Sequence, residues 1–279
     1  MVQCQVSNLK VITFNIRYNN PNDGPFSWEL RKPLAIDLIQ QEAPDILNLQ
    51  EALSGQITDL QQVLPGYRWV GAGRDDGNKS GEFNPVFYND IRFLLKGKGT
   101  FWLSETPDKP GTRSWNSACN RIVTWVKLYD RQSRKKIFVF NTHFDHASME
   151  ARNQSAHLLV SAIKQIAGKN WTIVTGDFND TEGSQMYKTL TGGLPELSLY
   201  NTSHISRNEP EGPSYSYVGF PFNPQEGNTI DFIFTKNNKS VTVIEHRVST
   251  YNFQGKYPSD HLPVIVNFEI KPKKKKYAL

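Results

Sequence analysis

Five apolar stretches of this sequence each carry, near one end, a side chain that can bind a metal ion or transfer a proton. These residues are Asn15 in VITFNIR, Glu51 in DILNLQE, His143 in KIFVFNTHF, Asp177 in TIVTGDFN and Asp231 in TIDFIF. Side chains alternate between the two faces of a strand, so each residue shares a face with apolar neighbours. A buried polar group is costly unless it is paired or bound to a metal. The five strands are therefore predicted to converge on one polar site.

Three further residues extend this set and indicate its chemistry. Asn179 shares the face of Asp177 on the same stretch. The motif SDHLPV near the C-terminus adds Asp260 and His261. Carboxylate and amide oxygens suit Mg²⁺ or Mn²⁺, and Asp231 beside His261 would orient the imidazole. Such a site activates a water molecule and neutralises charge on a phosphoryl group.

Taken singly, these residues have structural interpretations. A lone Asn15 is typical of a sheet-end amide, Glu51 can cap the helix that follows it, and GDFN can form an Asx turn. Their joint occurrence, together with SDHLPV, favours a site.

Other catalytic signatures match less well. NTHFDH fits the dizinc hydrolase pattern HxHxDH except at its first position, where Asn141 removes a zinc ligand. His157, His204 and His246 are interpreted as structural. The sequence has no G-x-S-x-G elbow, Walker A loop or G-x-G-x-x-G fingerprint.

The elements that must position these residues are many short strands and a few helices. Hydrophobic periodicity predicts strands over residues 10–17, 45–51, 67–71, 85–88, 99–103, 122–129, 136–144, 171–177, 229–235, 241–249 and 264–270. It predicts helices over 28–41, with Ser27 as the N-cap, and over 56–63, 149–167 and 184–190. No linker or internal repeat divides the chain, which indicates one α/β domain with packed sheets and outer helices. Loops are predicted over 18–27, 74–84, 105–118 and 205–227, and loops of this length are usually functional.

Seven motifs in a fixed order carry a family resemblance. They are TFNIRY, LQEA, the Arg of NRIVTW, NTHFDH, GDFN, IDFIF and SDHLPV. From about residue 10 to residue 268 the chain resembles the endonuclease/exonuclease/phosphatase family, the metal-dependent phosphoesterases related to deoxyribonuclease I. The wording of IDFIF and SDHLPV is similar to the carbon catabolite repressor-type deadenylases and their bacterial relatives. The resemblance implies a four-layer α/β sandwich, with two packed mixed β-sheets flanked by helices, formed as one domain by residues 1–270.

The resemblance also implies a role for each matching residue. Mg²⁺ or Mn²⁺ is the expected cofactor, and its expected ligands are Asn15, Glu51 and Asp260. The expected catalytic residues, which activate water or contact the phosphoryl and leaving groups, are His143, Asp177, Asn179, Asp231 and His261. The expected substrate-binding residues are Arg121 and His146.

The substrate class stays open between several phosphate esters. The leading expectation is a phosphodiester in RNA, DNA or a nucleotide, cleaved by in-line attack of water. The alternative is a phosphatase or phospholipase C-type hydrolase acting on inositol phosphates, sphingomyelin-like headgroups or other small phosphoesters. A phosphate-binding adaptor is disfavoured because no expected catalytic residue is missing. Asn228 stands where abasic-site endonucleases typically place a tryptophan, which counts against DNA repair.

Aromatic side chains gather in two of the long loops. They can stack on a base, sugar or headgroup, or they can anchor the loops, and the sequence does not separate these roles. The residues are Trp115, Tyr215, Tyr217, Phe220 and Phe222.

The basic charge of the chain is concentrated at its C-terminus. The net charge is +5, and the last nine residues, KPKKKKYAL, hold five lysines. Without them the 27 remaining Lys and Arg equal the 27 Asp and Glu. Residues 271–279 are therefore expected to form a disordered tail that contacts polyanions such as RNA or an anionic membrane.

Composition restricts the remaining properties. No apolar run approaches the roughly 20 residues of a transmembrane helix. The segment MVQCQVSNLK has no signal-peptide pattern, so a cytoplasmic location is the default and a secreted or periplasmic one applies if a leader was removed. Cys4 and Cys119 are too few for a disulfide framework or a zinc cluster, and a monomer is expected.

Overall fold

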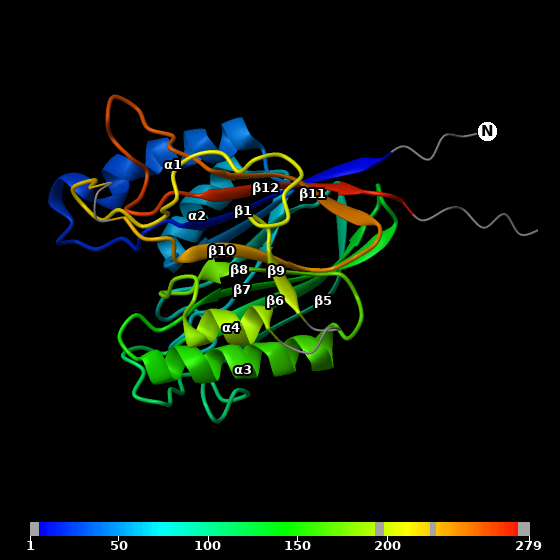
Figure 1. Cartoon of the computed structure of the whole chain (residues 1–279). Helices are drawn as coiled ribbons and strands as arrows, with labels where there is room; N and C mark the ends of the chain where they lie inside the picture. The colour runs from blue at the N-terminus through cyan, green and yellow to red at the C-terminus, as the bar shows by residue number, and fades with distance from the viewer. Residues whose placement is uncertain (1–5, 193–197, 224–226, 273–279) are drawn as a thin grey trace, which may run out of the picture.

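Two six-stranded β-sheets pack face to face in the computed structural model, and helices cover their outer faces (Figure 1). The structure describes residues 6–192, 198–223 and 227–272. The first sheet has the strand order β11-β12-β1-β2-β4-β3, and the second has the order β5-β6-β7-β8-β10-β9. Both sheets are mixed, because β1 is parallel to β2 and β7 is parallel to β8 while the other pairs are antiparallel. The predicted four-layer α/β sandwich is confirmed.

Most of the element boundaries fall close to the predicted ones. The strands are β1 (Ser7–Asn15), β2 (Ile46–Gln50), β3 (Tyr67–Val70), β4 (Val86–Asn89), β5 (Phe93–Trp102), β6 (Ile122–Asp130), β7 (Lys135–His143), β8 (Thr172–Asp177), β9 (Leu199–Asn201), β10 (Asp231–Lys236), β11 (Val241–Val248) and β12 (Val264–Ile270). The helices are η1 (Gly24–Phe26), α1 (Trp28–Glu42), α2 (Ser54–Val63), α3 (Met149–Ile166) and α4 (Gln185–Thr191).

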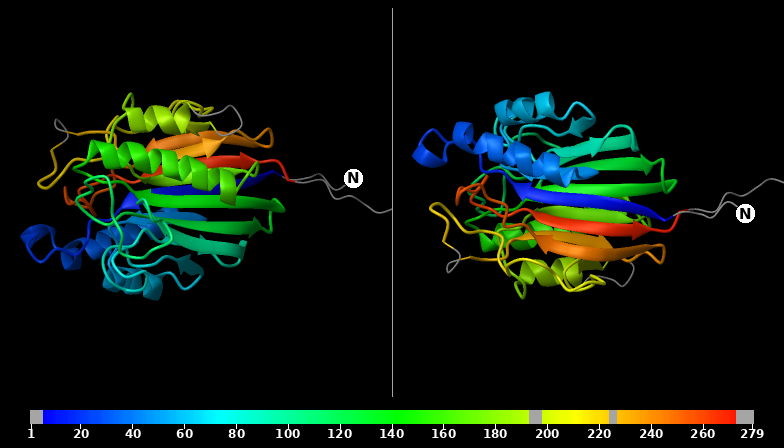
Figure 2. Two further views of the ribbon diagram at one scale, coloured as in Figure 1. Left: turned by 90° about the horizontal axis from the view of Figure 1, so that it is seen from below. Right: turned by 90° about the horizontal axis from the view of Figure 1, so that it is seen from above.

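The two sheets come from different parts of the chain. The first sheet combines the N-terminal strands β1 to β4 with the C-terminal strands β11 and β12. The second sheet is made entirely from the middle of the chain, β5 to β10. Figure 2 looks onto the faces of the two sheets, one lying over the other, with the long loops gathered at one end.

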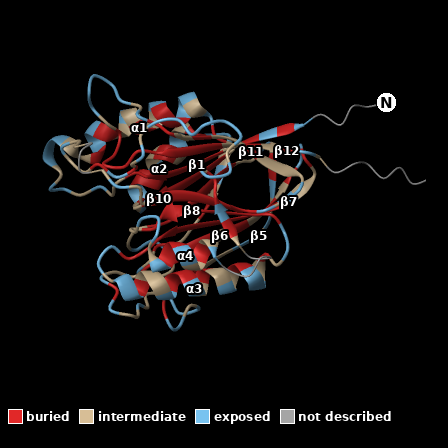
Figure 3. Ribbon diagram, viewed as in Figure 1, coloured by how far each residue is buried: buried red, intermediate tan, exposed pale blue. Residues whose placement is uncertain are grey.

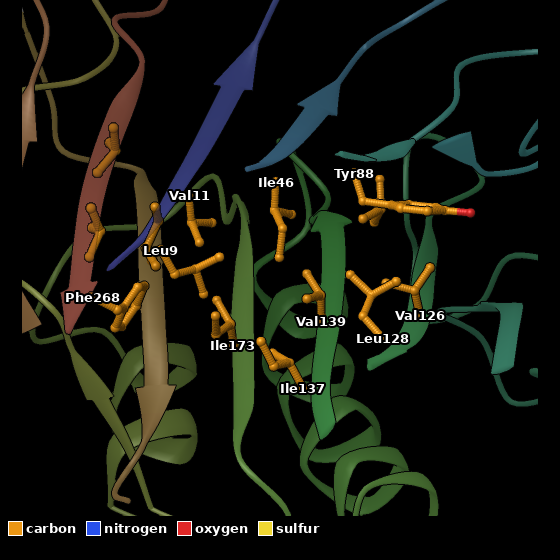
Figure 4. Packing of buried hydrophobic residues seen from close by; sticks show 14 of the residues in the cluster. Leu9, Val11, Ile46, Tyr88, Val126, Leu128, Ile137, Val139, Ile173 and Phe268 are labelled. Carbon is orange, nitrogen blue, oxygen red and sulfur yellow. The ribbon is translucent and has the colours of Figure 1, made fainter. Parts of the chain in front are cut away.

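The main core lies between the two sheets. Leu9 and Val11 of β1 and Ile46 of β2 face Val139 of β7 and Ile173 of β8 (Figure 4). The outer faces are buried as well, under α1 and α2 on the first sheet and under α3 and α4 on the second (Figure 3). Because both faces of the central strands are buried, these strands are nearly continuous apolar runs, and a polar residue on them requires an explanation.

Two strands differ from the predictions. β5 begins at Phe93, whereas the predicted strand begins at residue 99. The segment Lys96-Gly97-Lys98 resembles a turn in the sequence, but it forms a bulged part of the strand next to β6. The short edge strand β9 was not predicted. Ser27 does occupy the N-cap of α1, but its side chain makes no capping hydrogen bond.

Residues 273–279 of the predicted basic tail lie outside the described residues. Among the described residues, no helix combines the length and the apolar composition that crossing a membrane requires.

Candidate active site

The polar ends of the five predicted strands meet at one end of the sandwich. In the second sheet His143 pairs beside Asp177, and Asp177 pairs beside Asp231, so the three lie in one row across β7, β8 and β10. In the first sheet Asn15 pairs beside Gln50, which directly precedes Glu51. The register of the strands therefore aligns these side chains within each sheet, and both groups lie at the same end of the sandwich.

A cavity of about 530 Å³ opens at this end. Two of the ten predicted site residues, Asn15 and Asp231, are fully buried behind its wall and are bonded to residues that line it. The eight that line the cavity are Glu51, Arg121, His143, His146, Asp177, Asn179, Asp260 and His261.

Asn15 connects the two sheets at the centre of the site. Its Nδ2 donates to Glu51 Oε1 and to Asp177 Oδ2, both at 3.0 Å, and lies 3.3 Å from His261 Nε2. Its Oδ1 accepts the N–H of Arg17 at 3.0 Å. The amide nitrogen of Asn15 thus faces the acidic cluster, while the amide oxygen, the atom that a metal would need, is used by the backbone.

His261 is held by a buried carboxylate. Its Nδ1 lies 2.8 Å from Asp231 Oδ2, and both side chains are buried. Burial lowers the pKa of His261, but the charges of Asp231, Asp177 and Asp260 outweigh it and raise the pKa to about 10. The imidazole is therefore a cation at neutral pH and presents an N–H to the cavity.

Asp177 is a buried carboxyl group whose pKa is also raised. Burial and the charge of Asp231 raise its pKa to about 7, against the effect of His261 and of the Asn15 hydrogen bond. Its Oδ1 accepts the N–H of Asn179 at 2.9 Å, and Asn179 has the left-handed φ of 50° that this turn requires. A carboxylate with this pKa can accept a proton from water near neutral pH.

His143 is neutral. Burial and the charge of Arg121 lower its pKa well below the usual value. Asn179 Nδ2 lies 2.9 Å from His143 Nε2 and also donates to the carbonyl of Phe144. His143 Nε2 is therefore the acceptor, and the ring proton is on Nδ1. Glu82 Oε2 lies 4.0 Å from Nδ1.

Arg121 is a buried cation whose nitrogens are only partly used. Its Nη2 lies 3.0 Å from His146 Nδ1, and its Nε lies 3.7 Å from Asp145 Oδ2. Arg121 is buried, with 4% of its surface exposed, yet its Nε and Nη1 have no hydrogen-bond partner among the described residues. Donors of this kind at a cavity wall suit an anionic ligand.

Several residues that line the cavity were not identified from the sequence. Arg74 donates through Nη1 to Glu82 Oε2 at 2.6 Å, and burial raises the pKa of Glu82. Tyr217, one of the loop aromatics noted in the sequence, also lines the cavity and packs its ring 4.9 Å from that of His261. Cys119, to which the sequence assigned no role in the site, also lines the cavity. The length of loop 74–84 was the only signal for Arg74 and Glu82. The other lining residues that were missed are Arg17, Tyr18 and Ile230.

The acidic cluster fits a divalent cation. A carboxylate oxygen of Glu51, one of Asp177 and a ring nitrogen of His261 lie within 4.8 Å of one another. The protonated imidazole has no free lone pair, so the carboxylates are the candidate ligands. Asp260 lines the same cavity, and burial, reinforced by the charge of Glu51, raises its pKa. Crowded carboxylates with raised pKa values are relieved by a bound cation, so the donor set suits Mg²⁺ or Mn²⁺.

Comparison with known proteins identifies the family. The sequence model of the Endonuclease/Exonuclease/phosphatase family matches residues 12–261. The chain belongs to this family. Family members are hydrolases, nucleases and phosphatases among them, and are generally dependent on divalent metals.

Two solved structures of this family are similar over nearly the whole chain. An endonuclease/exonuclease/phosphatase from Bacteroides vulgatus is 36% identical with a TM-score of 0.89, covering 95% of this chain and 99% of that one. A mannosyl-6-phosphatase from Bacteroides thetaiotaomicron is 30% identical with a TM-score of 0.85, covering 93% and 99%.

Deadenylase-type homologues are also detected, as the motif wording predicted. Nocturnin from Drosophila melanogaster is 27% identical over 88% of this chain and 42% of its own length. The Ccr4 3′-5′-exoribonuclease subunit from Coccidioides immitis is 23% identical over 94% and 46%. The chain therefore spans less than half the length of these two relatives.

Proposed function

We propose that this family member is a divalent-metal-dependent phosphoesterase that hydrolyses a small phosphate ester by in-line attack of water. The observation that carries the proposal is the placement of His261 Nε2 3.7 Å from Asp177 Oδ2 in one cavity, where the surroundings raise the pKa of both groups. Asp177 can accept a proton and His261 can donate a hydrogen bond at the same pH.

The side chains take complementary roles around a bound phosphate. Asp177 accepts the proton of the attacking water. Protonated His261, fixed by Asp231, donates to a phosphoryl oxygen and stabilises the charge that develops there. The free N–H groups of Arg121 bind a second oxygen. Neutral His143 lies beside Asn179 at the wall of the same cavity, where it is placed to contact the leaving oxygen.

The metal would be held chiefly by Glu51, with Asp260 and Asp177 beside it. When bound, it supplies neutralisation of charge on the phosphoryl group. Asn15 takes a supporting part, because its N–H group holds the Glu51 and Asp177 carboxylates in place.

A small phosphoester is favoured over a nucleic acid by the charge of the cavity. Its lining carries three arginines and the protonated His261 against four carboxyl groups, those of Glu51, Glu82, Asp177 and Asp260, so cations are not in excess. A nucleic-acid backbone needs an excess of cations along its path. The mannosyl-6-phosphatase, which this chain matches over 99% of that protein's length, supports the same choice. A phosphodiester substrate is the second candidate, supported by the similarity to nocturnin and Ccr4.

A metal and substrate panel tests the proposal. We expect Mg²⁺ or Mn²⁺ to support hydrolysis of p-nitrophenyl phosphate and mannose 6-phosphate, and to a lesser extent of bis-p-nitrophenyl phosphate and single-stranded RNA. EDTA should abolish the activity. Faster turnover of RNA than of any monoester would select the second candidate. Activity that survives EDTA, or that only zinc restores, would contradict the proposed metal site.

A further inference from the structure

A second hollow of about 590 Å³, which we call the aromatic groove, lies next to the catalytic cavity. It is defined by Phe26, Leu30, Leu34, Phe220, Phe222 and Tyr257. Its walls are mainly apolar side chains, whereas the catalytic cavity is lined mainly by charged ones.

Three chain segments form walls of both hollows. The segment that places Tyr18 in the cavity continues to Phe26 in the groove. The segment of Tyr217 continues to Phe220, and the segment of Tyr257 leads within three residues to Asp260. These loops gather at the catalytic end of the molecule, at the left of both panels of Figure 2. A ligand bound in one hollow is thus adjacent to the other.

Arg31 fixes two of these segments through hydrogen bonds to their backbone carbonyls. Its guanidinium donates to the carbonyls of Phe26 and Pro258 at 2.6 and 2.9 Å. It also donates to the carbonyls of Ile16 and Arg17 at 2.7 and 3.1 Å. Because these bonds occupy its nitrogens, Arg31 braces the groove and does not attract an anion into it.

The groove is preformed by stacked aromatic pairs. The rings of Phe26 and Phe220 are 4.5 Å apart and nearly parallel, and those of Phe222 and Tyr257 are 4.0 Å apart and nearly parallel. Leu30 stands at the rim with 61% of its surface exposed. Contiguous apolar surface of this kind is typical of a binding site.

We propose that the aromatic groove binds an aromatic group of the phosphate ester whose phosphate occupies the catalytic cavity. This inference rests on the proposed function. Flat rings stack favourably on aromatic walls, and of the two cations that line the groove Arg31 is engaged with backbone carbonyls while Lys256 is exposed. A nucleobase and an aryl leaving group share this chemistry, and the experiment separates them.

The test compares esters that differ mainly in ring size. Phenyl phosphate and 2-naphthyl phosphate have leaving groups of similar acidity, and glycerol 1-phosphate has no ring. We expect kcat/KM for 2-naphthyl phosphate to exceed that for phenyl phosphate by about tenfold. Adenosine 5′-monophosphate serves as the nucleobase substrate. A similar advantage of this nucleotide over glycerol 1-phosphate would identify a base as the natural ring.

Leu30→Glu introduces a charge at the rim of the groove at a site that tolerates substitution because it is exposed. It should abolish the preference for 2-naphthyl phosphate while glycerol 1-phosphate is still hydrolysed. Ile91→Glu is the matched control, because Ile91 is 78% exposed in the turn between β4 and β5, outside the groove. It should leave the preference unchanged. Phe222→Ala provides a second, uncharged variant.

The outcomes separate this inference from the proposed function. If the ratio of kcat/KM for 2-naphthyl phosphate to that for phenyl phosphate is the same in wild type, Leu30→Glu and Phe222→Ala, the aromatic groove does not bind the ring, but the phosphoesterase proposal is unaffected. The inference would also be overturned if the wild type is a dimer and Leu30→Glu is a monomer, because a second copy of the chain would then cover the groove. If the wild type hydrolyses none of the esters, a fluorescence titration with 2-naphthyl phosphate decides: binding lost in Leu30→Glu supports the groove, and no binding to the wild type overturns it.

Discussion

Asp177 and His261 show how burial gives two neighbouring side chains opposite tasks. Both are almost completely buried, yet the surrounding charges keep His261 protonated and raise the pKa of Asp177 to about 7. Asp231 contributes to both effects, since its carboxylate stabilises the imidazolium and repels the second carboxylate. Removing one charge should therefore disturb catalysis more than folding.

Asp177→Asn tests this expectation. The amide keeps the size of the side chain but cannot accept a proton from water, so kcat should fall by at least on the order of 10²-fold. The thermal unfolding midpoint should not fall with it, because the carboxylate is itself unfavourable when buried. Steady-state kinetics and a thermal melt on the same preparation measure both quantities.

Asp90→Asn is the matched control for this substitution. Asp90 forms an exposed ion pair with Arg68 in the turn after β4, outside the cavity lining. It should leave kcat unchanged. Near-normal turnover in purified Asp177→Asn would contradict the role proposed for Asp177.

Metal affinity should depend on pH through the same carboxyl group. A pKa raised to about 7 means that the folded protein holds this proton below pH 7, and the proton competes with the cation. From pH 8.5 to pH 5.5 the affinity for Mn²⁺ should therefore fall by roughly 30-fold. The folding stability of the metal-free protein should change with pH in the opposite direction. Protonation of a group with a raised pKa stabilises the fold, so stability increases as the pH falls through 7.

Thermal melts over a series of Mn²⁺ concentrations at the two pH values give the affinities. In Asp177→Asn the affinity should be lower and should depend less on pH. The same Mn²⁺ affinity at both pH values in the wild type would show that Asp177 is not part of the metal site.

Among the strands, Asn141 shows how one polar residue joins the two sheets. It lies on β7, completely buried, and its Nδ2 donates to the carbonyls of Leu49 and Pro85 at 2.8 and 3.0 Å. Its Oδ1 accepts from Gln50 Nε2 at 2.6 Å and lies 3.2 Å from Thr175 Oγ1. The asparagine that breaks the dizinc pattern therefore has a place in the core, where it forms bonds between the sheets.

Asn141→Ala should destabilise the protein by about 3 kcal/mol, because it leaves several buried groups without partners. The free energy of unfolding in urea measures the loss. Asn237→Ala, at an exposed position after β10, should change it by no more than about 0.5 kcal/mol. A loss of less than about 1 kcal/mol at Asn141 would mean that water replaces its bonds.

Regular elements made much of the fold and the convergence of the site predictable. Asn15, Glu51 and Asp177 were recognisable because each interrupts a strand that is apolar on both faces. Arg74 and Glu82 were not recognisable, because loop 74–84 has no periodicity from which their direction follows. In β5, Gly97 hid the first half of the strand, since a glycine between lysines is typical of a turn.

At the scale of the whole molecule, the excess of basic charge lies in the last nine residues. Removal of residues 271–279 takes away the five lysines that make up the net charge of +5. Binding to single-stranded RNA or to anionic vesicles at low salt should weaken, because such contacts depend on these charges. Filter binding or vesicle sedimentation measures the change.

Turnover of p-nitrophenyl phosphate should be the same with and without the tail. A tail in which these lysines are replaced by glutamine keeps the length and provides the control for charge. Unchanged polyanion affinity in both variants would assign the binding to the folded body instead.

The strand order also sets when activity can arise during synthesis. The second sheet is complete once β10 has been made, but in the first sheet β1 waits for β12, its antiparallel neighbour. Asp260 and His261 are made immediately before β12. A nascent chain that has emerged from the ribosome up to β10 therefore has ten of the twelve described strands but lacks Asp260 and His261, so the candidate site stays incomplete until the segment just before β12 has been made.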